Sequence, residues 1–307
     1  MYSRLQTANL KSMRDGSAAI VYNRRDRPEG NCMPSTYAHG YFGALVRGQL
    51  PEEIQNRLLP EQDLFEIGLQ GPDLLFYYNP LKRNPVSEEG NRLHQLTGRE
   101  FFTEAADALR QQEGETRAAG LAYLDGVVCH FVLDSMCHGY INEYGKLHGV
   151  PHAVIEGDFD RSLIEARGRD PVKEDLVRSF HPSDRAGEVT AHFYTRENRK
   201  ILTQTIRRFA FFHHILYCPG NRKRHALYLG LKMIGQYESL RGHIIADHAD
   251  PDCAESDAFL QQLMTEAVPV AVRLIREFPA SLRDPQYDFT FEGGKPSGGP
   301  GKSGQNT

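Results

Sequence analysis

An almost uninterrupted apolar stretch from Ala118 to Met136 constrains the fold of this 307-residue chain more than any other feature. Its apolar residues cover every side of a helix, which is typical of a helix buried inside a helical domain. His130 and Asp134 lie within the stretch, and His138 follows it directly. Polar side chains are costly in such surroundings unless they are paired or bind a metal. We therefore expect a core helix that carries a polar site.

The ligand-type residues continue in the next segment, where His152 and Glu156 are again four positions apart. Residues four apart in a helix project from one face, with Cβ atoms about 5–6 Å apart. His130 and His138 would lie about 12 Å apart along the helix axis, whereas bonds from zinc to imidazole or carboxylate measure about 2.0–2.2 Å. Because one ion cannot reach both imidazoles, the spacing predicts two or three metals with Asp134 shared between them.

Spacing alone is weak evidence for a metal site. With 13 His and 40 acidic residues in the chain, about one or two pairs of the form His-x-x-x-Asp/Glu are expected by chance, and four occur. The two early pairs stand out because they are close together, share apolar surroundings and enclose His138. The later pairs, His243–Asp247 and His248–Asp252, lie in a more polar segment that is typical of a helix end.

Three other metal-site signatures are missing from the chain. There is no His-Asp dipeptide, no Glu-x-x-His of the di-iron bundles and no HExxH of the metalloproteases. The remaining combination of imidazole and carboxylate ligands without thiolate suits a zinc cluster best, while manganese and iron stay open on ligand type alone.

Helical periodicity dominates the rest of the chain, and strand signals are nearly missing. We expect helices over Glu52–Leu59, Arg99–Gln112, Thr116–Tyr144, Ala153–Ala166, Val189–Phe212, Arg222–His243 and Ala258–Phe278. The sequence therefore predicts an all-α fold with a single multi-helix domain over residues 33–288. Residues 1–32 form a polar leader, and the Gly- and Pro-rich residues 289–307 are expected to be disordered.

Composition limits the function and the compartment. The net charge of −4 argues against a surface for polyanions, so a nucleic-acid partner is not expected. The five cysteines are scattered and odd in number, which favours a reducing environment. Neither a signal peptide nor a membrane-spanning segment stands out. We therefore expect a cytoplasmic protein.

The spacing of the cluster resembles that of the zinc-dependent phospholipase C family, whose distant relatives include the S1-type zinc nucleases. In that family an HxxxD pair, a further His and an HxxxE pair come from neighbouring helices. The further His and the His of the HxxxE pair are fourteen positions apart. The chain keeps this separation, although the gap from Asp134 to His138 is two residues shorter. The resemblance spans roughly residues 33–167 and adds three upstream candidates: His39 in MPSTYAHGYFG, Asp73 in GLQGPDLLFYYNP and His94 in NRLHQLTGREFF.

The resemblance implies an all-α fold and a ligand set for two or three Zn²⁺ ions. Asp73, His94, His130 and Asp134 would hold one ion, His138, His152 and Glu156 a second, and His39 with the shared Asp134 a third. Asp73 would also be the catalytic residue, orienting or deprotonating the attacking water. Simpler interpretations stay open: His39 as a surface or capping residue, Asp73 as a helix N-cap and His94 as a solvated side chain.

The chain departs from the secreted members of the family at its start. In those proteins the mature amino terminus binds the third zinc, whereas 32 residues precede Met33 here, with six basic and three acidic side chains. Because every family-like feature begins at Met33, we expect translation to start there or the leader to be a disordered extension. Removal of Met33 would leave Pro34 as a free terminus within reach of His39. A retained leader would put the third zinc in doubt.

The expected activity is the metal-dependent hydrolysis of a phosphoric ester, either a phospholipid or a smaller phosphodiester. Two alternatives stay open. The first is a non-catalytic metal-binding protein of the same fold, and the second is a nuclease-like phosphodiesterase. The natural substrate and the oligomeric state cannot be predicted from the sequence.

Overall fold

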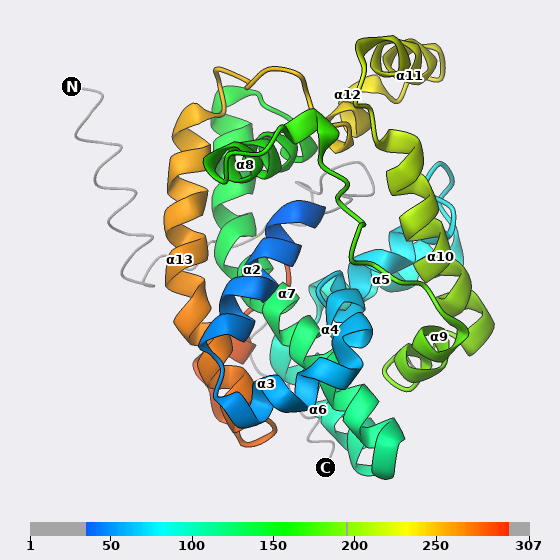
Figure 1. Cartoon of the computed structure of the whole chain (residues 1–307), viewed down its shortest axis with the longest axis vertical. Helices are drawn as coiled ribbons and strands as arrows, with labels where there is room; N and C mark the ends of the chain where they lie inside the picture. The colour runs from blue at the N-terminus through cyan, green and yellow to red at the C-terminus, as the bar shows by residue number, and fades with distance from the viewer. Residues whose placement is uncertain (1–34, 195, 295–307) are drawn as a thin grey trace, which may run out of the picture.

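The computed structural model describes residues 35–194 and 196–294, and every regular element in these residues is a helix (Figure 1). The β-type pairing in this part of the chain is limited to an isolated bridge between Thr97 and Thr290. One continuous apolar core runs through the described residues. The all-α fold class predicted from the sequence is confirmed.

The helix bounds are α2 (Thr36–Gln49), α3 (Glu52–Leu58), α4 (Gln62–Gly68), α5 (Pro85–Gln95), α6 (Gly98–Arg110), α7 (Gly114–His148), α8 (His152–Ala166), α9 (Asp184–Ala191), α10 (Arg199–Leu216), α11 (Asn221–Met233), α12 (Tyr237–Leu240) and α13 (Ala254–Glu277). Short 3-10 helices are η1 (Leu59–Glu61), η2 (Gly71–Tyr78), η3 (Pro171–Lys173), η4 (Arg241–His243), η5 (Ala280–Arg283) and η6 (Pro285–Asp288).

The central helix is α7, which runs for 35 residues and packs against α2, α4 and α13. Paired glycines let α4 and α7 approach backbone to backbone. A Cβ atom on Gly68 would lie 2.2 Å from the carbonyl oxygen of Tyr123, and one on Gly126 would lie 2.3 Å from that of Phe65. The helix ends where Gly149 adopts a φ of 70°, a left-handed conformation that glycine takes at no steric cost.

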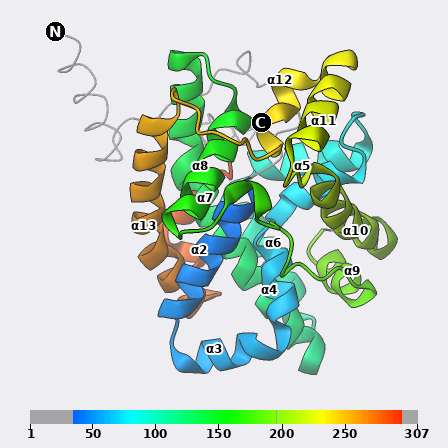
Figure 2. The same ribbon diagram turned by 45° about the horizontal axis from the view of Figure 1, so that its top comes forward.

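The other helices cover α7 from two sides. Figures 1 and 2 show α13 on the opposite side of the molecule from α9 and α10, with α2, α7 and α8 close to α13. On the far side, η2 packs against both α5 and α10. Elements from the two sides therefore meet over the middle of α7, at the turns that carry the candidate ligands.

Among the described residues, α7 is the one helix long and apolar enough to cross a membrane. Within the fold, 89% of its most apolar window is buried. Packing in a protein core accounts for this composition as well as a membrane would, and it agrees with the core helix predicted from the apolar stretch.

Most of the predicted helices are present, namely Glu52–Leu59 as α3, Arg99–Gln112 as α6, Thr116–Tyr144 within α7, Ala153–Ala166 within α8 and Ala258–Phe278 as the larger part of α13. Helices α2, α4 and α5 were not predicted. Each of them contains glycine, whose low helix propensity weakens the local signal.

The single helix predicted over Val189–Phe212 is wrong, because the chain breaks between α9 and α10. Phe193 and Tyr194 are buried in this break, and the hydroxyl of Tyr194 lies 2.6 Å from that of Tyr123 on α7. The side chain of Asn198 then caps the start of α10. Tertiary burial of two aromatic side chains has overridden the local helical pattern.

The helix predicted over Arg222–His243 is also too long. Helix α11 ends at Met233, and Gly235 has a φ of 68°, a conformation that ends a helix. The rest of the predicted range, up to His243, forms only the short helices α12 and η4. A glycine in the left-handed region thus separates two segments that share one helical periodicity.

The disordered tail predicted from residue 289 onward is wrong for residues 289–294. Phe291 is fully buried, with ring centroids 5.6 Å from Phe101 and 5.0 Å from Phe131. The carbonyl of Phe289 accepts a hydrogen bond from the N–H of Gly98 at 2.8 Å. The buried ring of Phe291 and the backbone carbonyl of Phe289 hold this segment on the core. The polar leader and residues 295–307 lie outside the described residues.

Candidate metal centre

Five elements from distant parts of the chain converge on one largely buried region of α7 and its neighbours. The residues predicted as ligands are His39 from α2, Asp73 from η2, His94 from α5, His130, Asp134 and His138 from α7, and His152 and Glu156 from α8. The structure brings seven of them into two groups whose possible ligand atoms lie within 4.8 Å of one another, and places His39 against the first group.

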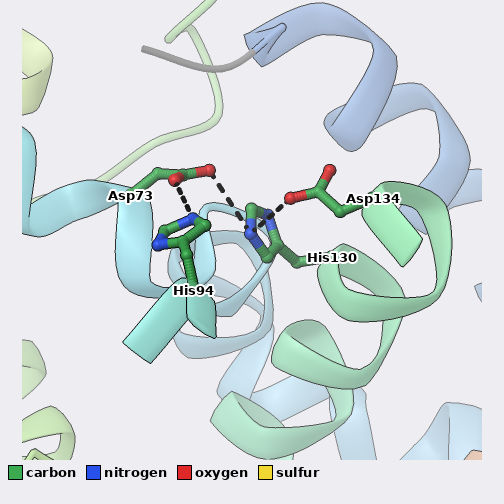
Figure 3. Close-up of side chains that lie close together, drawn as sticks. All are labelled: Asp73, His94, His130 and Asp134. Atoms are coloured by element: carbon green, nitrogen blue, oxygen red, sulfur yellow. Dashed lines mark ion pairs between the residues drawn. The ribbon is translucent and has the colours of Figure 1, made fainter. Parts of the chain in front are cut away.

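The first group consists of Asp73, His94, His130 and Asp134 (Figure 3). One oxygen of Asp73 lies 2.7 Å from Nε2 of His94, and the other lies 3.3 Å from Nε2 of His130. The same His130 nitrogen is 3.1 Å from Oδ2 of Asp134. Figure 3 shows Asp73 on one side of His130 and Asp134 on the other. Two imidazoles and two carboxylates thus surround one small volume.

The second group consists of His138, His152 and Glu156. Oε1 of Glu156 lies 3.4 Å from Nε2 of His138 and 3.2 Å from Nε2 of His152. The His152 side chain keeps 16% of its surface exposed, against 8% for His138. The second group is therefore the more open of the two.

Asp134 joins the two groups. Its Oδ2 faces His130, while Oδ1 lies 3.1 Å from Nε2 of His39 and 3.7 Å from Nε2 of His138. This is the shared position predicted from the helix spacing. His39 also stacks on the His130 ring, with centroids 4.5 Å apart. One carboxylate therefore contacts three imidazoles from α2 and α7.

Oxygen acceptors behind the imidazoles orient three of the rings. Nδ1 of His94 lies 2.7 Å from the carbonyl oxygen of Gly90, Nδ1 of His130 lies 3.2 Å from that of Leu69, and Nδ1 of His152 lies 3.0 Å from the side-chain oxygen of Asn142. A ring that donates from Nδ1 has its lone pair on Nε2, and Nε2 is the atom that faces the groups. Metal-binding histidines usually have such a second partner.

Gly71 lets η2 pass directly against His130. Its φ is 49°, and a Cβ atom at this position would lie 2.3 Å from the His130 ring. Asp73, two residues later, therefore reaches both His94 and His130. The alternative interpretation of Asp73 as a helix N-cap does not fit, because the residue lies inside η2, whose N-cap is Gln70.

The charges in the site favour a cation. Burial alone would raise the pKa of Asp134, but the three neighbouring imidazoles hold it well below its ordinary value. Burial likewise opposes the protonation of His94 and His138, yet the nearby carboxylates raise the pKa of His94 to about 9, chiefly through Asp73, and that of His138 to about 10, chiefly through Asp134. Among the described residues, neither Asp73 nor Asp134 has a Lys or Arg partner.

The donor atoms fit zinc. Nε2 of His130, Oδ2 of Asp134 and Nε2 of His152 are buried, and in the described part of the chain they make ion-pair contacts at 3.1–3.3 Å but no hydrogen bond. Unsatisfied buried polar atoms are rare in proteins, and a bound ion would satisfy them. Nitrogen and carboxylate oxygen donors without thiolate are a common zinc ligand set. The third predicted ion has only His39 and Asp134 as donors within the described residues, and the proposed terminus at Pro34 lies outside them.

The remaining histidines have other surroundings. The later pairs do not form a metal-binding group in the described residues, and Asp247 instead lies 3.5 Å from Arg224. His213 is a buried core residue whose Nε2 lies 3.1 Å from the hydroxyls of both Thr36 and Tyr77. Burial lowers its pKa to about 3, so it is neutral.

Sequence reasoning missed Glu292, which belongs to the segment interpreted as a disordered tail. Its Oε2 lies 3.9 Å from Nδ1 of His138, within the range of an ion pair. The alternation of Phe289 and Phe291 was the available signal that this segment is anchored.

One protein family, described as zinc dependent phospholipase C, matches residues 38–209. This range covers more than half of the chain and includes all eight candidate ligands. Comparisons with curated proteins and with solved structures give no match. The motifs, the all-α fold and this match agree, and the chain belongs to the zinc-dependent phospholipase C family.

Proposed function

We propose that this protein is a zinc-dependent hydrolase of phosphoric esters. The observation that carries the proposal is the pair of His and carboxylate groups that meet at Asp134. Ions held on either side of one carboxylate would lie close enough to bind the same phosphate, as in other two-metal sites. Membership of the family supports zinc and a phosphoric-ester substrate at the level of the chemistry.

The two groups would hold at least two ions, and His39 would add a donor to a third. Bound zinc would neutralise the charge of the phosphate and lower the pKa of a water molecule towards neutrality. The protein holds donors at fixed positions on α7 and α8, and backbone carbonyl oxygens at Nδ1 orient the rings of His94 and His130. Burial keeps bulk water away from the first group.

Asp73 is our candidate for the catalytic residue. Its carboxylate lies on the side of His130 opposite Asp134 (Figure 3), and His94 at 2.7 Å fixes its orientation. A carboxylate in this position could accept the proton of a water that attacks phosphorus, provided that the water lies within hydrogen-bond reach. Asp73 would therefore serve both as a ligand and as the proton acceptor.

A cavity beside the second group is our candidate for the substrate entrance. Its lining includes Glu156 together with Thr36, Asp160, His213 and His243. No Lys or Arg is among the described residues that line it, which argues against a polyanionic chain such as nucleic acid. The cavity has room for about one water molecule, so it marks the side from which a substrate would approach and does not choose between a phospholipid and a smaller phosphodiester.

Metal analysis followed by turnover of bis-p-nitrophenyl phosphate tests the proposal. We expect two or more zinc ions per chain and hydrolysis that falls roughly 10²–10³-fold in His130→Ala, as when a comparable electrostatic contact is lost. His225→Ala is the matched control, because His225 is exposed on α11 and should leave both quantities unchanged. Less than one metal per chain, or activity untouched by His130→Ala, would overturn the proposal. Bound zinc without turnover of any phosphoric ester would favour the non-catalytic alternative.

We also propose that the protein works in a reducing compartment, the cytoplasm. Cys129, Cys137, Cys218 and Cys253 are all free thiols and are buried. Four unpaired cysteines in the described residues support this environment, since disulfides form readily in secreted proteins.

A further inference from the structure

The segment from Thr290 to Gly294, here called the C-terminal turn, packs against α7 beside the candidate ligands. Its backbone is held by a hydrogen bond from the N–H of Thr290 to the carbonyl of Gly294 at 2.9 Å, and by one from Gly293 back to Thr290 at 3.0 Å. Gly293 has a φ of 73°, and a Cβ atom there would lie 2.9 Å from the nitrogen of Gly139 and 3.0 Å from the oxygen of Ser135. Glycine permits this close approach to the turn of α7 that carries His138.

The same turn touches the first ligand group. The buried ring of Phe291 lies 5.8 Å from that of His94 and 5.9 Å from that of His130, measured between centroids. Just before the turn, the side chain of Gln286 donates a hydrogen bond to the hydroxyl of Ser135 at 2.8 Å. These contacts fix the chain on both sides of Glu292, which lies between Phe291 and Gly293.

Among the described residues, the Nδ1 atom of His138 lacks the oxygen acceptor that three other imidazoles in the site have. His94, His130 and His152 each have an oxygen acceptor at Nδ1, whereas Nδ1 of His138 is buried and has no hydrogen-bond partner in the described part of the chain. The nearest carboxylate oxygen paired with it is Oε2 of Glu292, at 3.9 Å. Nε2 of His138, at the other end of the ring, faces Asp134 and Glu156.

We propose that Glu292 is the positioning residue of His138: it accepts a hydrogen bond from Nδ1–H and so presents the Nε2 lone pair to the metal of the second group. The proposal rests on the proposed function, because it presumes a cation held by that group. Glu292 itself is not placed as a ligand, since it lies on the side of the ring away from Glu156. Its side chain is 37% exposed, so a rotation can shorten 3.9 Å to the usual hydrogen-bond length of about 2.9 Å.

The test measures zinc affinity directly, by competition between the full-length chain and a chromophoric chelator. Loss of an outer partner of a metal-binding histidine typically weakens metal affinity about 10–100-fold, so we expect a change of this size for one zinc in Glu292→Ala. Glu292→Gln should recover most of the affinity, because its amide oxygen can still accept from Nδ1–H. Glu143→Ala is the control, because Glu143 is an exposed carboxylate on α7, one turn and a half beyond His138.

A second comparison assigns the effect to the second group. The variant His152→Ala should lose the zinc of this group, and the double variant with Glu292→Ala should bind no more weakly than His152→Ala alone. The urea midpoint of the metal-free protein should be the same in Glu292→Ala and the wild type, because a positioning role acts on the ligand and not on the fold.

The outcomes separate this inference from the proposed function. A wild-type protein that binds less than one zinc per chain would overturn both, whereas zinc bound in the first group alone would overturn only the role of Glu292. Normal zinc binding in the wild type with unchanged affinity in Glu292→Ala would overturn the role of Glu292 alone. Equal losses in the Ala and Gln variants, or a lowered urea midpoint of the metal-free Glu292→Ala protein, would also overturn it, because they would assign Glu292 a purely structural role.

Discussion

Phe291→Ala is the substitution that tests most directly whether the C-terminal turn belongs to the core. The ring is fully buried and packs against Phe101, Phe131, His94 and His130. Replacing a buried Phe by Ala typically costs about 3–5 kcal/mol. The turn lies near the end of the described chain and can relax into part of the space, so we expect a loss of about 3 kcal/mol. In a domain of this size, such a loss lowers the melting temperature by roughly 6–12 °C.

Urea denaturation in the presence of a chelator measures this loss without a contribution from bound metal. Phe211→Ala is the control, because its side chain is 58% exposed on α10 and its removal should change the free energy of unfolding by less than about 0.5 kcal/mol. A loss below about 1 kcal/mol in Phe291→Ala would show that the turn is not packed as described. It would also remove the structural basis for the role of Glu292.

Three further predictions concern the metal centre and its supports. Zinc affinity should rise as the pH increases from 6 towards 9. Burial opposes the protonation of His94 and His138, but the neighbouring carboxylates raise their pKa values to about 9 and 10, so zinc must displace protons at lower pH. Calorimetry in buffers of different ionisation enthalpy counts these protons. Gly71→Ala should weaken zinc binding and lower stability by more than about 1 kcal/mol, because its Cβ would collide with the His130 ring; chelator competition and urea denaturation would detect both. Asp160→Ala should cost about 1–2 kcal/mol in urea denaturation, since this carboxylate accepts two backbone N–H groups at the start of α2, whereas Asp160→Asn should cost less.

The part of the site that was predictable from the residues alone is the part formed by local spacing. His130, Asp134 and His138 lie on one helix, and the pitch of a helix determines how far apart their side chains are. The apolar surroundings of these residues identified the helix as buried before any tertiary contact was known. His152 and Glu156 follow the same rule on α8.

The upstream residues required the family resemblance, because nothing in their local sequence indicates where they lie. His39 is on a helix with several glycines that was not predicted, and Asp73 is in a 3-10 helix that approaches His130 only because Gly71 has no side chain. Glu292 is separated from His138 by more than a hundred residues and was assigned to a disordered tail on composition. Long-range contacts of this kind leave no periodicity in the sequence.

The two ends of the described chain meet at His130, and this arrangement links metal binding to the closure of the fold. The ring of His39 from α2 stacks on His130 at 4.5 Å, while Phe291 from the C-terminal turn lies at 5.9 Å. Both end segments pack on the His130 ring of the first group, and ordering them there costs conformational entropy. In the metal-free protein the buried carboxylates are balanced by imidazolium groups, which require protons at His94 and His138. Ions that replace these protons would bind donors from η2, α5 and α7 in the first group and from α7 and α8 in the second, so their binding energy would stabilise the packing of distant segments as well as the site itself.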